Sequence, residues 1–200
     1  MEAKLSKHQA TEGLPGLLRP RDLAREGLSR NRALTLLRAG RLERVGRGLY
    51  RRVDASITEH ETIALVCKQA PRAVVCLLSA LQVHGLGTQS PRQVWMALDR
   101  KARKPKFSGL RVRVVRFSGP MMRYGVVERQ IQGVPVRITS PARTVVDCFR
   151  YRRKLGLDVA LEALRDALRS RRATVPEIIR AAEMCRARSI VQPYLESMAS

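Results

Sequence analysis

The chain has 200 residues, and its 39 lysines and arginines against 17 acidic residues give a formal net charge of +22. So large a positive charge attracts polyanions, which leaves nucleic acid, an anionic membrane surface and an acidic protein as classes of partner. Hydrophobic residues make up 44% of the chain, which excludes wholesale disorder, and no apolar run approaches the ~18 residues that cross a bilayer.

The first quarter of the chain predicts short helices with tight turns. Residues 5–13 and residues 19–27 each show a helical pattern that ends at a glycine. A third helix is predicted between Ser29, a suitable N-cap, and Gly40. Its apolar face is expected to consist of Leu34, Leu36 and Leu37.

Residues 41–53 then predict a two-stranded hairpin, with its turn at Gly46-Arg47-Gly48. Short helices followed by a glycine-containing hairpin are the order of a winged helix-turn-helix, whose last helix fits the DNA major groove. We expect specificity from the polar side of that helix, and affinity from basic residues that face phosphates. The predicted specificity residues are Arg30, Asn31, Arg32 and Thr35, and the predicted phosphate contacts are Arg38, Arg44, Arg47 and Arg51.

A second interpretation of the same region is open. Residues 27–46 also resemble the S4 type of RNA-binding module, in which a helix containing Ser and Arg precedes a small hairpin. The helical segments upstream and the sequence "GRGLYRR" favour the winged helix. Duplex DNA is therefore the predicted partner, and structured RNA is the alternative.

The middle of the chain mixes helices and strands. An apolar helix is predicted over residues 57–70, and a buried one follows and stops at Gly85. Four strands come next, and the basic loop from Arg100 to Lys106 separates the first two. That loop could extend a DNA footprint, contact an acidic partner or be solvated only. The predicted strands cover residues 93–98, 110–117, 125–131 and 134–139.

The last third of the chain, from Pro141, predicts helices only. Ser140 followed by Pro141 is a strong start signal, and Thr174 with Glu177 has the spacing of a capping box. The last helix is expected to bend or break near Pro193. Between these lies an amphipathic helix, whose expected apolar stripe consists of Leu157, Leu161, Leu164 and Leu168.

These elements predict an α/β (α+β) chain in two parts. Residues 1–53 form a winged helix-turn-helix. Residues 54–200 form a mixed domain with a mainly antiparallel sheet and C-terminal helices. A winged helix of this kind commonly needs a second copy to cover a palindrome, and either a dimer or a monomer that loads twice would cover an inverted repeat.

Three stretches together carry a family resemblance. "RLERVGRGLYRR", then "LLSALQVHGL", then "ITSPARTVVDCF" occur in an order and spacing that resemble the AbiEi-type antitoxin family of type IV toxin–antitoxin systems. The match runs from about Leu5 to Leu195. The resemblance implies an N-terminal winged helix and a C-terminal antitoxin domain. It also implies binding to promoter inverted repeats, repression of the operon, and action against a nucleotidyltransferase-like toxin. Orphan regulators share this layout.

The sequence offers little chemistry for an enzyme. Asp99 and Lys101 have the D-x-K spacing of metal-dependent nucleases, with Glu128 as the nearest further carboxylate, but Asp is also common in turns. Arg143 and Asp147 lie four apart on a helix and are expected to be structural. We expect no catalytic residue, no metal and no cofactor.

The four cysteines stand singly in apolar segments, and the three histidines are scattered, which gives a zinc site weak support. Buried, reduced thiols are the expectation. The first residues, "MEAKLSKHQATEG", have no apolar stretch typical of a signal peptide. The sequence therefore predicts a cytoplasmic location, without association with a membrane.

Overall fold

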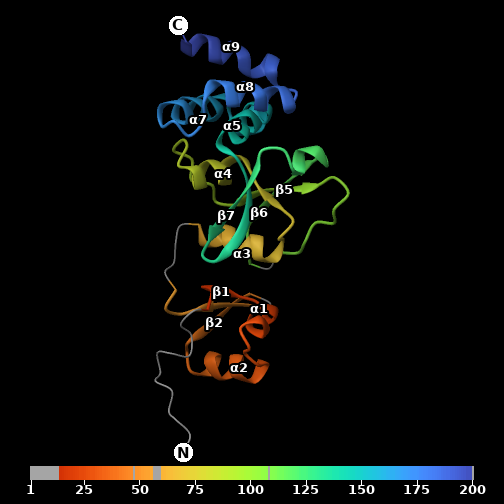
Figure 1. Ribbon diagram of the computed structural model, residues 1–200, viewed down its shortest axis with the longest axis vertical. Coiled ribbons are helices and arrows are strands. Elements are labelled where there is room, and N and C mark those ends of the chain that lie inside the picture. The colour runs from red at the N-terminus through yellow and green to blue at the C-terminus, as the bar shows by residue number, and fades with distance from the viewer. Residues whose placement is uncertain (1–13, 47, 56–59, 108, 200) are drawn as a thin grey trace, which may run out of the picture.

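The computed structural model describes residues 14–46, 48–55, 60–107 and 109–199, apart from the side chains of Arg30 and Ala199 (Figure 1). The helix predicted over residues 5–13 lies outside the described residues, and so does Arg47. The fold class predicted from the sequence is confirmed, because helices and strands are mixed and the last third of the described chain is helical.

The N-terminal part is a three-stranded antiparallel sheet with two helices, in which the strands lie in the order β1-β3-β2. The predicted hairpin is present, with a register shift between Arg44 and Gly46. The strand β1 was not predicted, because two residues are too short to show a period. In chain order the elements are β1 (Leu17–Leu18), α1 (Pro20–Arg25), α2 (Arg30–Arg38), β2 (Leu42–Gly46) and β3 (Leu49–Arg52).

A second, five-stranded sheet has the order β6-β5-β4-β8-β7. Its pairs β4–β5 and β7–β8 are antiparallel, but β5–β6 and β4–β8 are parallel, so the sheet is more mixed than predicted. Alternation along β6 showed that the strand is half-buried, and it carries no information on direction. The elements here are α3 (Glu61–Gln69), β4 (Val74–Val75), α4 (Leu77–His84), β5 (Val94–Asp99), β6 (Val112–Phe117), the 3₁₀ helix η1 (Pro120–Met122), β7 (Val126–Ile131) and β8 (Val134–Thr139).

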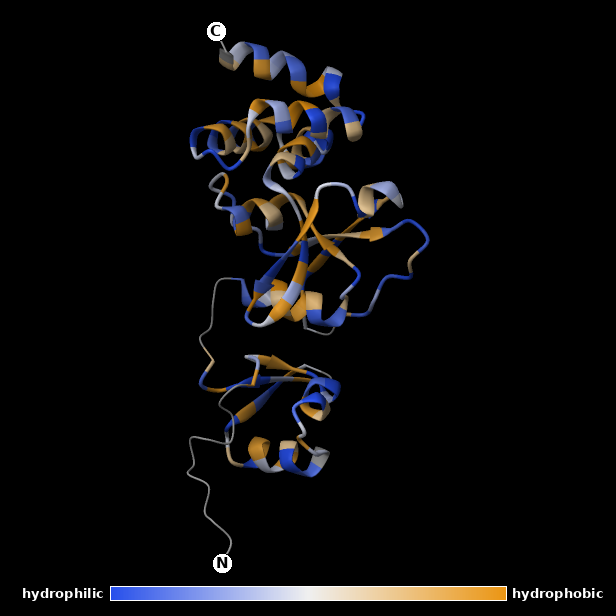
Figure 2. Ribbon diagram, in the orientation of Figure 1, coloured by the Kyte–Doolittle hydropathy of each residue, from blue (hydrophilic) through white to orange (hydrophobic). Residues whose placement is uncertain are grey.

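Both faces of this sheet are buried at its centre, as the alternation along β5 shows, whereas the edge strand β7 is largely exposed. Met96 points into the apolar cluster that α3 completes, whereas Trp95 and Ala97 point into the cluster formed with α4 and the C-terminal helices. Figure 2 shows hydrophobic residues both on the central strands and on the helices that cover them. The sheet therefore separates two apolar layers.

The C-terminal helices stack beyond the second sheet (Figure 1). Ser140 caps α5 by accepting a hydrogen bond from the Arg143 amide, and Thr174 with Glu177 forms the predicted capping box. Pro193 lies inside α9 rather than ending it. The helices are α5 (Pro141–Arg150), α6 (Arg152–Leu155), α7 (Leu157–Arg169), α8 (Val175–Met184) and α9 (Arg188–Ala199).

The apolar stripe predicted for α7 is wrong in detail. Leu157 is 37% exposed, whereas Leu164 and several alanines are buried. The small residues let α7 approach α5 closely, so the packed face is centred on alanine rather than on leucine. The buried alanines are Ala160, Ala163 and Ala167.

All four cysteines are buried and unpaired. Burial raises the pKa of the Cys67 thiol to about 12 and that of the Cys185 thiol to about 11. Along the described parts of the chain, no helix combines the length and the apolar character that crossing a bilayer requires.

Candidate nucleic-acid interface

The helix α2 begins and ends where the sequence predicted. The Ser29 Oγ accepts a hydrogen bond from the Arg32 amide at 3.2 Å, which satisfies a backbone donor of the first turn. Gly40, just beyond the last turn, has φ +65°, a conformation that a residue with a side chain rarely adopts. Nine residues are thus held as a rigid rod, which is the shape that a major groove admits.

One side of α2 holds the helix on the N-terminal core. Ala33 and Leu36 are buried against Leu18, Leu23 and Leu42. Leu37 is partly buried at the edge of this cluster. The core contact of α2 is therefore narrow and is made by small and aliphatic side chains.

Leu34 is not part of that apolar face, contrary to the sequence prediction, because it is 42% exposed. Successive residues of a helix are about 100° apart, so Leu34 lies well around the helix from Ala33 and Leu36. The outward side of α2 instead combines this leucine with polar residues. Its exposed members are Asn31, Leu34, Thr35 and Arg38, with Arg32 on the flank.

The predicted specificity residues whose side chains are described therefore lie on one exposed side of α2. No hydrogen bond or ion pair ties the side chains of Arg32 and Arg38 to the described part of the chain. The Thr35 Oγ1 donates to the Asn31 carbonyl at 3.0 Å. Arg30 occupies the first position of α2, but its side chain lies outside what is described.

The hairpin next to α2 presents a second basic position. Arg44 on β2 is exposed, and its Nε donates to the Gly46 carbonyl at 3.3 Å. Gly48 has φ +63° in the turn that joins β2 to β3. Arg47, which is also a predicted phosphate contact in this hairpin, lies outside the described residues.

Arg51 has a different environment from the other predicted phosphate contacts. Its guanidinium is paired with both Glu43 and Glu61, and its side chain is only 20% exposed. The hydrogen bonds to these two carboxylates raise the pKa of Arg51. The residue thereby joins the hairpin to α3, and sequence spacing alone did not reveal this because Glu61 belongs to another element.

Further contacts join α1 and the N-terminal sheet to α3. The Lys68 Nζ lies 2.5 Å from the Asp22 Oδ2, and Leu17 and Leu49 pack into the cluster of α3. Burial opposes the charge of Asp22, but the hydrogen bonds from Lys68 and the Arg19 amide outweigh it and lower the pKa of Asp22. As Figure 1 shows, α2 lies on the far side of this sheet from α3.

The possible nuclease residues do not form a site. The Asp99 Oδ1 accepts from the Lys101 amide at 2.9 Å, as in a turn. Glu128 is on β7, which is separated from β5 by β4 and β8. Among the described residues, no group of three or more His, Cys, Asp or Glu side chains is placed to hold a metal ion.

The Arg143–Asp147 pair predicted to be structural is buried, and a buried histidine also has a structural environment. The Arg143 Nε donates to the Asp147 Oδ2 at 2.9 Å, and both side chains are fully buried. The His84 Nε2 lies 2.7 Å from the Thr139 carbonyl, so this histidine bonds to β8. Burial lowers the pKa of His84 to about 4, which keeps the ring neutral.

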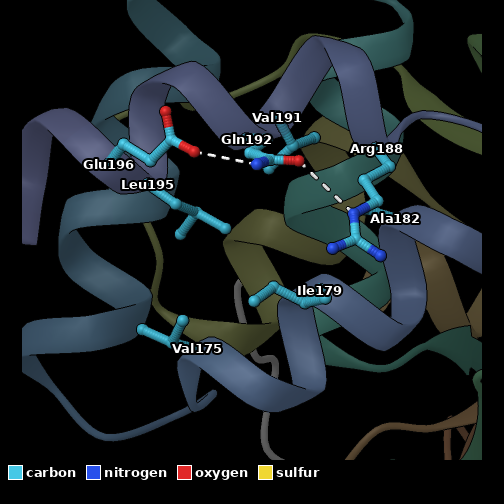
Figure 3. Close-up of a pocket in the computed structure, with 8 residues that line it drawn as sticks. All are labelled: Val175, Ile179, Ala182, Arg188, Val191, Gln192, Leu195 and Glu196. Carbon is cyan, nitrogen blue, oxygen red and sulfur yellow. Dashed lines mark hydrogen bonds between the residues drawn. The ribbon is translucent and has the colours of Figure 1, made fainter.

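A recess of about 220 Å³ lies between α8 and α9 (Figure 3). Its lining is mainly apolar, and a chain of hydrogen bonds runs along the α9 side. Arg188 donates to Gln192, and Gln192 donates to Glu196. The polar groups at the rim therefore bond to one another, and the recess shows no converging reactive groups. The apolar residues that line it are Val175, Ile179, Ala182, Val191 and Leu195.

Comparisons with known proteins agree with this arrangement. A family model described as "Transcriptional regulator, AbiEi antitoxin" matches residues 11–53, and one described as "AbiEi antitoxin C-terminal domain" matches residues 73–194. Among solved structures, the RV2827C protein from Mycobacterium tuberculosis is similar, with a TM-score of 0.51 and 16% identity over 84% of this chain and 67% of that chain. At that identity the likeness concerns the fold alone. No curated protein matches the sequence.

Proposed function

The chain belongs to the AbiEi antitoxin family, and from that premise we propose that it binds duplex DNA at inverted repeats in its own promoter and represses its operon. The observation that carries the proposal is the outward side of α2, which is exposed, polar and basic, and lies opposite the contacts with α3. The hairpin with Arg44 follows it directly. We keep residues 1–53 as the DNA-binding domain and residues 54–200 as the antitoxin domain.

The roles of the basic residues follow from their surroundings. Arg38 and Arg44 are exposed and available to phosphates, and Arg30 and Arg47 remain proposed contacts from their positions in the sequence. We give Arg51 a structural role instead, since Glu43 and Glu61 already neutralise it. A phosphate would have to replace two carboxylates there.

The DNA contact is testable by fluorescence anisotropy with the full chain and a duplex from upstream of its own gene. Arg44→Ala should weaken binding to all duplexes alike and reduce the salt slope by about 1. Asn31→Ala should selectively weaken the operator by about 5-fold to 150-fold, because an Asn–adenine pair is worth about 1–3 kcal/mol. The matched control is Arg165→Ala, an equal loss of charge on the exposed side of α7.

Two outcomes would contradict the DNA assignment. The first is a preference for structured RNA over duplex DNA at equal length, which would support the S4-like alternative. The second is an equal effect of Arg44→Ala and Arg165→Ala, which would mean that binding follows net charge and not the winged helix.

The proposal extends to the C-terminal domain through the family. We propose that it counteracts a nucleotidyltransferase-like toxin encoded beside it and that it acts in the cytoplasm, without a catalytic reaction of its own. Expression of the neighbouring reading frame should arrest growth, and co-expression of this chain should restore it. A variant with Arg44→Ala should still restore growth if repression and neutralisation are separate. Continued arrest with wild-type chain would contradict the antitoxin role.

The number of chains on DNA follows from the same geometry. Each chain has one α2 and so covers one half-site of an inverted repeat. We propose two chains per operator. Light scattering of complexes with two duplexes of equal length, one with the full repeat and one with a single half-site, should give masses that differ by one chain of 22.5 kDa.

A further inference from the structure

The outward side of α2 contains an apolar group among polar ones. Leu34 is 42% exposed, and it lies three residues after Asn31 and four before Arg38, on the side away from Ala33 and Leu36. Single exposed leucines are common on protein surfaces and need no explanation in general. This one lies in the middle of the surface that faces DNA in the proposed function.

Thr35, the next residue, adds to the apolar character of this surface. Its hydroxyl donates to the Asn31 carbonyl at 3.0 Å, so the O–H is already used within the helix. What Thr35 can still present is its methyl group and a hydroxyl lone pair. The side chains of Leu34 and Thr35 therefore offer no free hydrogen-bond donor.

Apolar contact has only one counterpart among the base edges of the major groove. Thymine is the only base that carries a methyl group there, whereas the other three are distinguished by their donors and acceptors. An uncharged, aliphatic surface placed between Asn31 and Arg38 fits this methyl group. A donor or acceptor opposite it would be left without a partner when water is excluded.

We propose that Leu34, helped by the methyl group of Thr35, reads a thymine by contact with its C5-methyl group. The inference rests on the proposed function and assigns a base to the surface that it defines. Asn31 and Arg38 on either side then contact the neighbouring bases or phosphates. The operator half-site accordingly contains a thymine that adenine, guanine or cytosine cannot replace without loss.

The test uses the full chain and an operator half-site defined by selection from a random duplex library. Each thymine of the selected site is replaced in turn by deoxyuridine, which keeps the base pair and lacks only the methyl group. Wild-type binding should fall about fourfold at one position or two adjacent ones, the value of one buried methyl group. Leu34→Ala should lose most of this preference and bind the thymine and deoxyuridine duplexes within twofold of each other.

Matched variants at Thr35 distinguish the contribution of its methyl group to the thymine preference from that of its hydroxyl. Thr35→Val keeps a methyl group and should retain the preference for thymine, whereas Thr35→Ser should reduce it. Both Leu34 and Thr35 are exposed, so these changes should leave the thermal midpoint unaltered. Equal midpoints confirm that any loss of binding is a loss of contact.

The results distinguish this inference from the proposed function. If the chain binds its operator and every deoxyuridine duplex binds within twofold of it, the thymine assignment is wrong and the DNA-binding proposal stands. The same holds if the thymine preference survives in Leu34→Ala, since another residue then reads the methyl group. If no duplex is selected at all, the proposed function is wrong and this inference falls with it.

Discussion

Removal of one partner from the Arg143–Asp147 pair should strongly destabilise the antitoxin domain. Both side chains are fully buried, and the Arg143 Nη1 also donates to the Tyr124 carbonyl at 2.7 Å. An exposed pair with the same i,i+4 spacing would contribute about 0.2–0.5 kcal/mol. Loss of one partner of a buried pair costs about 3–5 kcal/mol, because the remaining charge loses its hydrogen-bonded counterion. Arg150 lies 3.6 Å from the other carboxylate oxygen of Asp147 and offsets only part of this cost.

The raised pKa of Asp147 indicates what replacement of both residues should do. Burial raises the pKa of Asp147 even though Arg143 and Arg150 oppose the change. The attraction within the pair therefore does not fully repay the cost of taking the carboxylate out of water. Replacing both residues by apolar ones of similar size should consequently be far less harmful than replacing either one.

Urea unfolding of the full chain, followed by far-UV circular dichroism, measures both effects. At an m-value of about 2 kcal/mol per molar urea, Arg143→Met should lower the midpoint by about 2 M. Asp147→Leu should do the same. The double variant Arg143→Met/Asp147→Leu should recover most of the loss. The reasoning is refuted if each single variant stays within about 1 kcal/mol of the wild type, or if the two losses simply add.

Three further predictions concern the rest of the chain. With about six phosphates contacted, operator affinity should fall about a thousandfold between 50 and 200 mM salt, and a shallow slope in a salt titration would mean that few arginines face DNA. Because the pKa of His84 is lowered to about 4, protons bind the unfolded chain better between pH 6.5 and 4. Stability should therefore drop by about 2 kcal/mol from pH 7 to pH 5, and a His84→Gln variant that keeps the same pH dependence would contradict this. The four buried thiols should react with a thiol reagent only after unfolding in urea, and rapid reaction of the native chain would show that the packing around them opens.

Features that depend on neighbouring residues could be predicted from the sequence. Ser29 and Ser140 cap helices as expected, because an N-cap bond spans only three residues. Gly85 ends α4 in the left-handed conformation for an equally local reason. The hairpin and the outward positions of Asn31 and Arg38 followed from the same kind of pattern.

Features that depend on distant residues could not be predicted. The strand β1 exists because Leu17 pairs with Arg51, far along the chain. Arg51 counted as a phosphate contact from its place in the hairpin, and only the approach of Glu61 shows that it is neutralised. Leu34 counted as core because it is apolar, but Ala33 and Leu36 already fill the space beneath α2.

The same distinction decides what the net charge of +22 means for function. Several arginines, including exposed ones, donate to backbone carbonyls of the chain. Arg116 bonds to the carbonyls of Asp99 and Ala102, and Arg137 bonds to those of Arg72 and Met122. Such a guanidinium holds loops in place and is poorly available to a phosphate. Arg38 on α2 has no acceptor in the described part of the chain. The DNA footprint is therefore set by the exposed arginines of α2 and the hairpin whose guanidinium groups are not fully used by the fold, and it is smaller than the charge alone suggests.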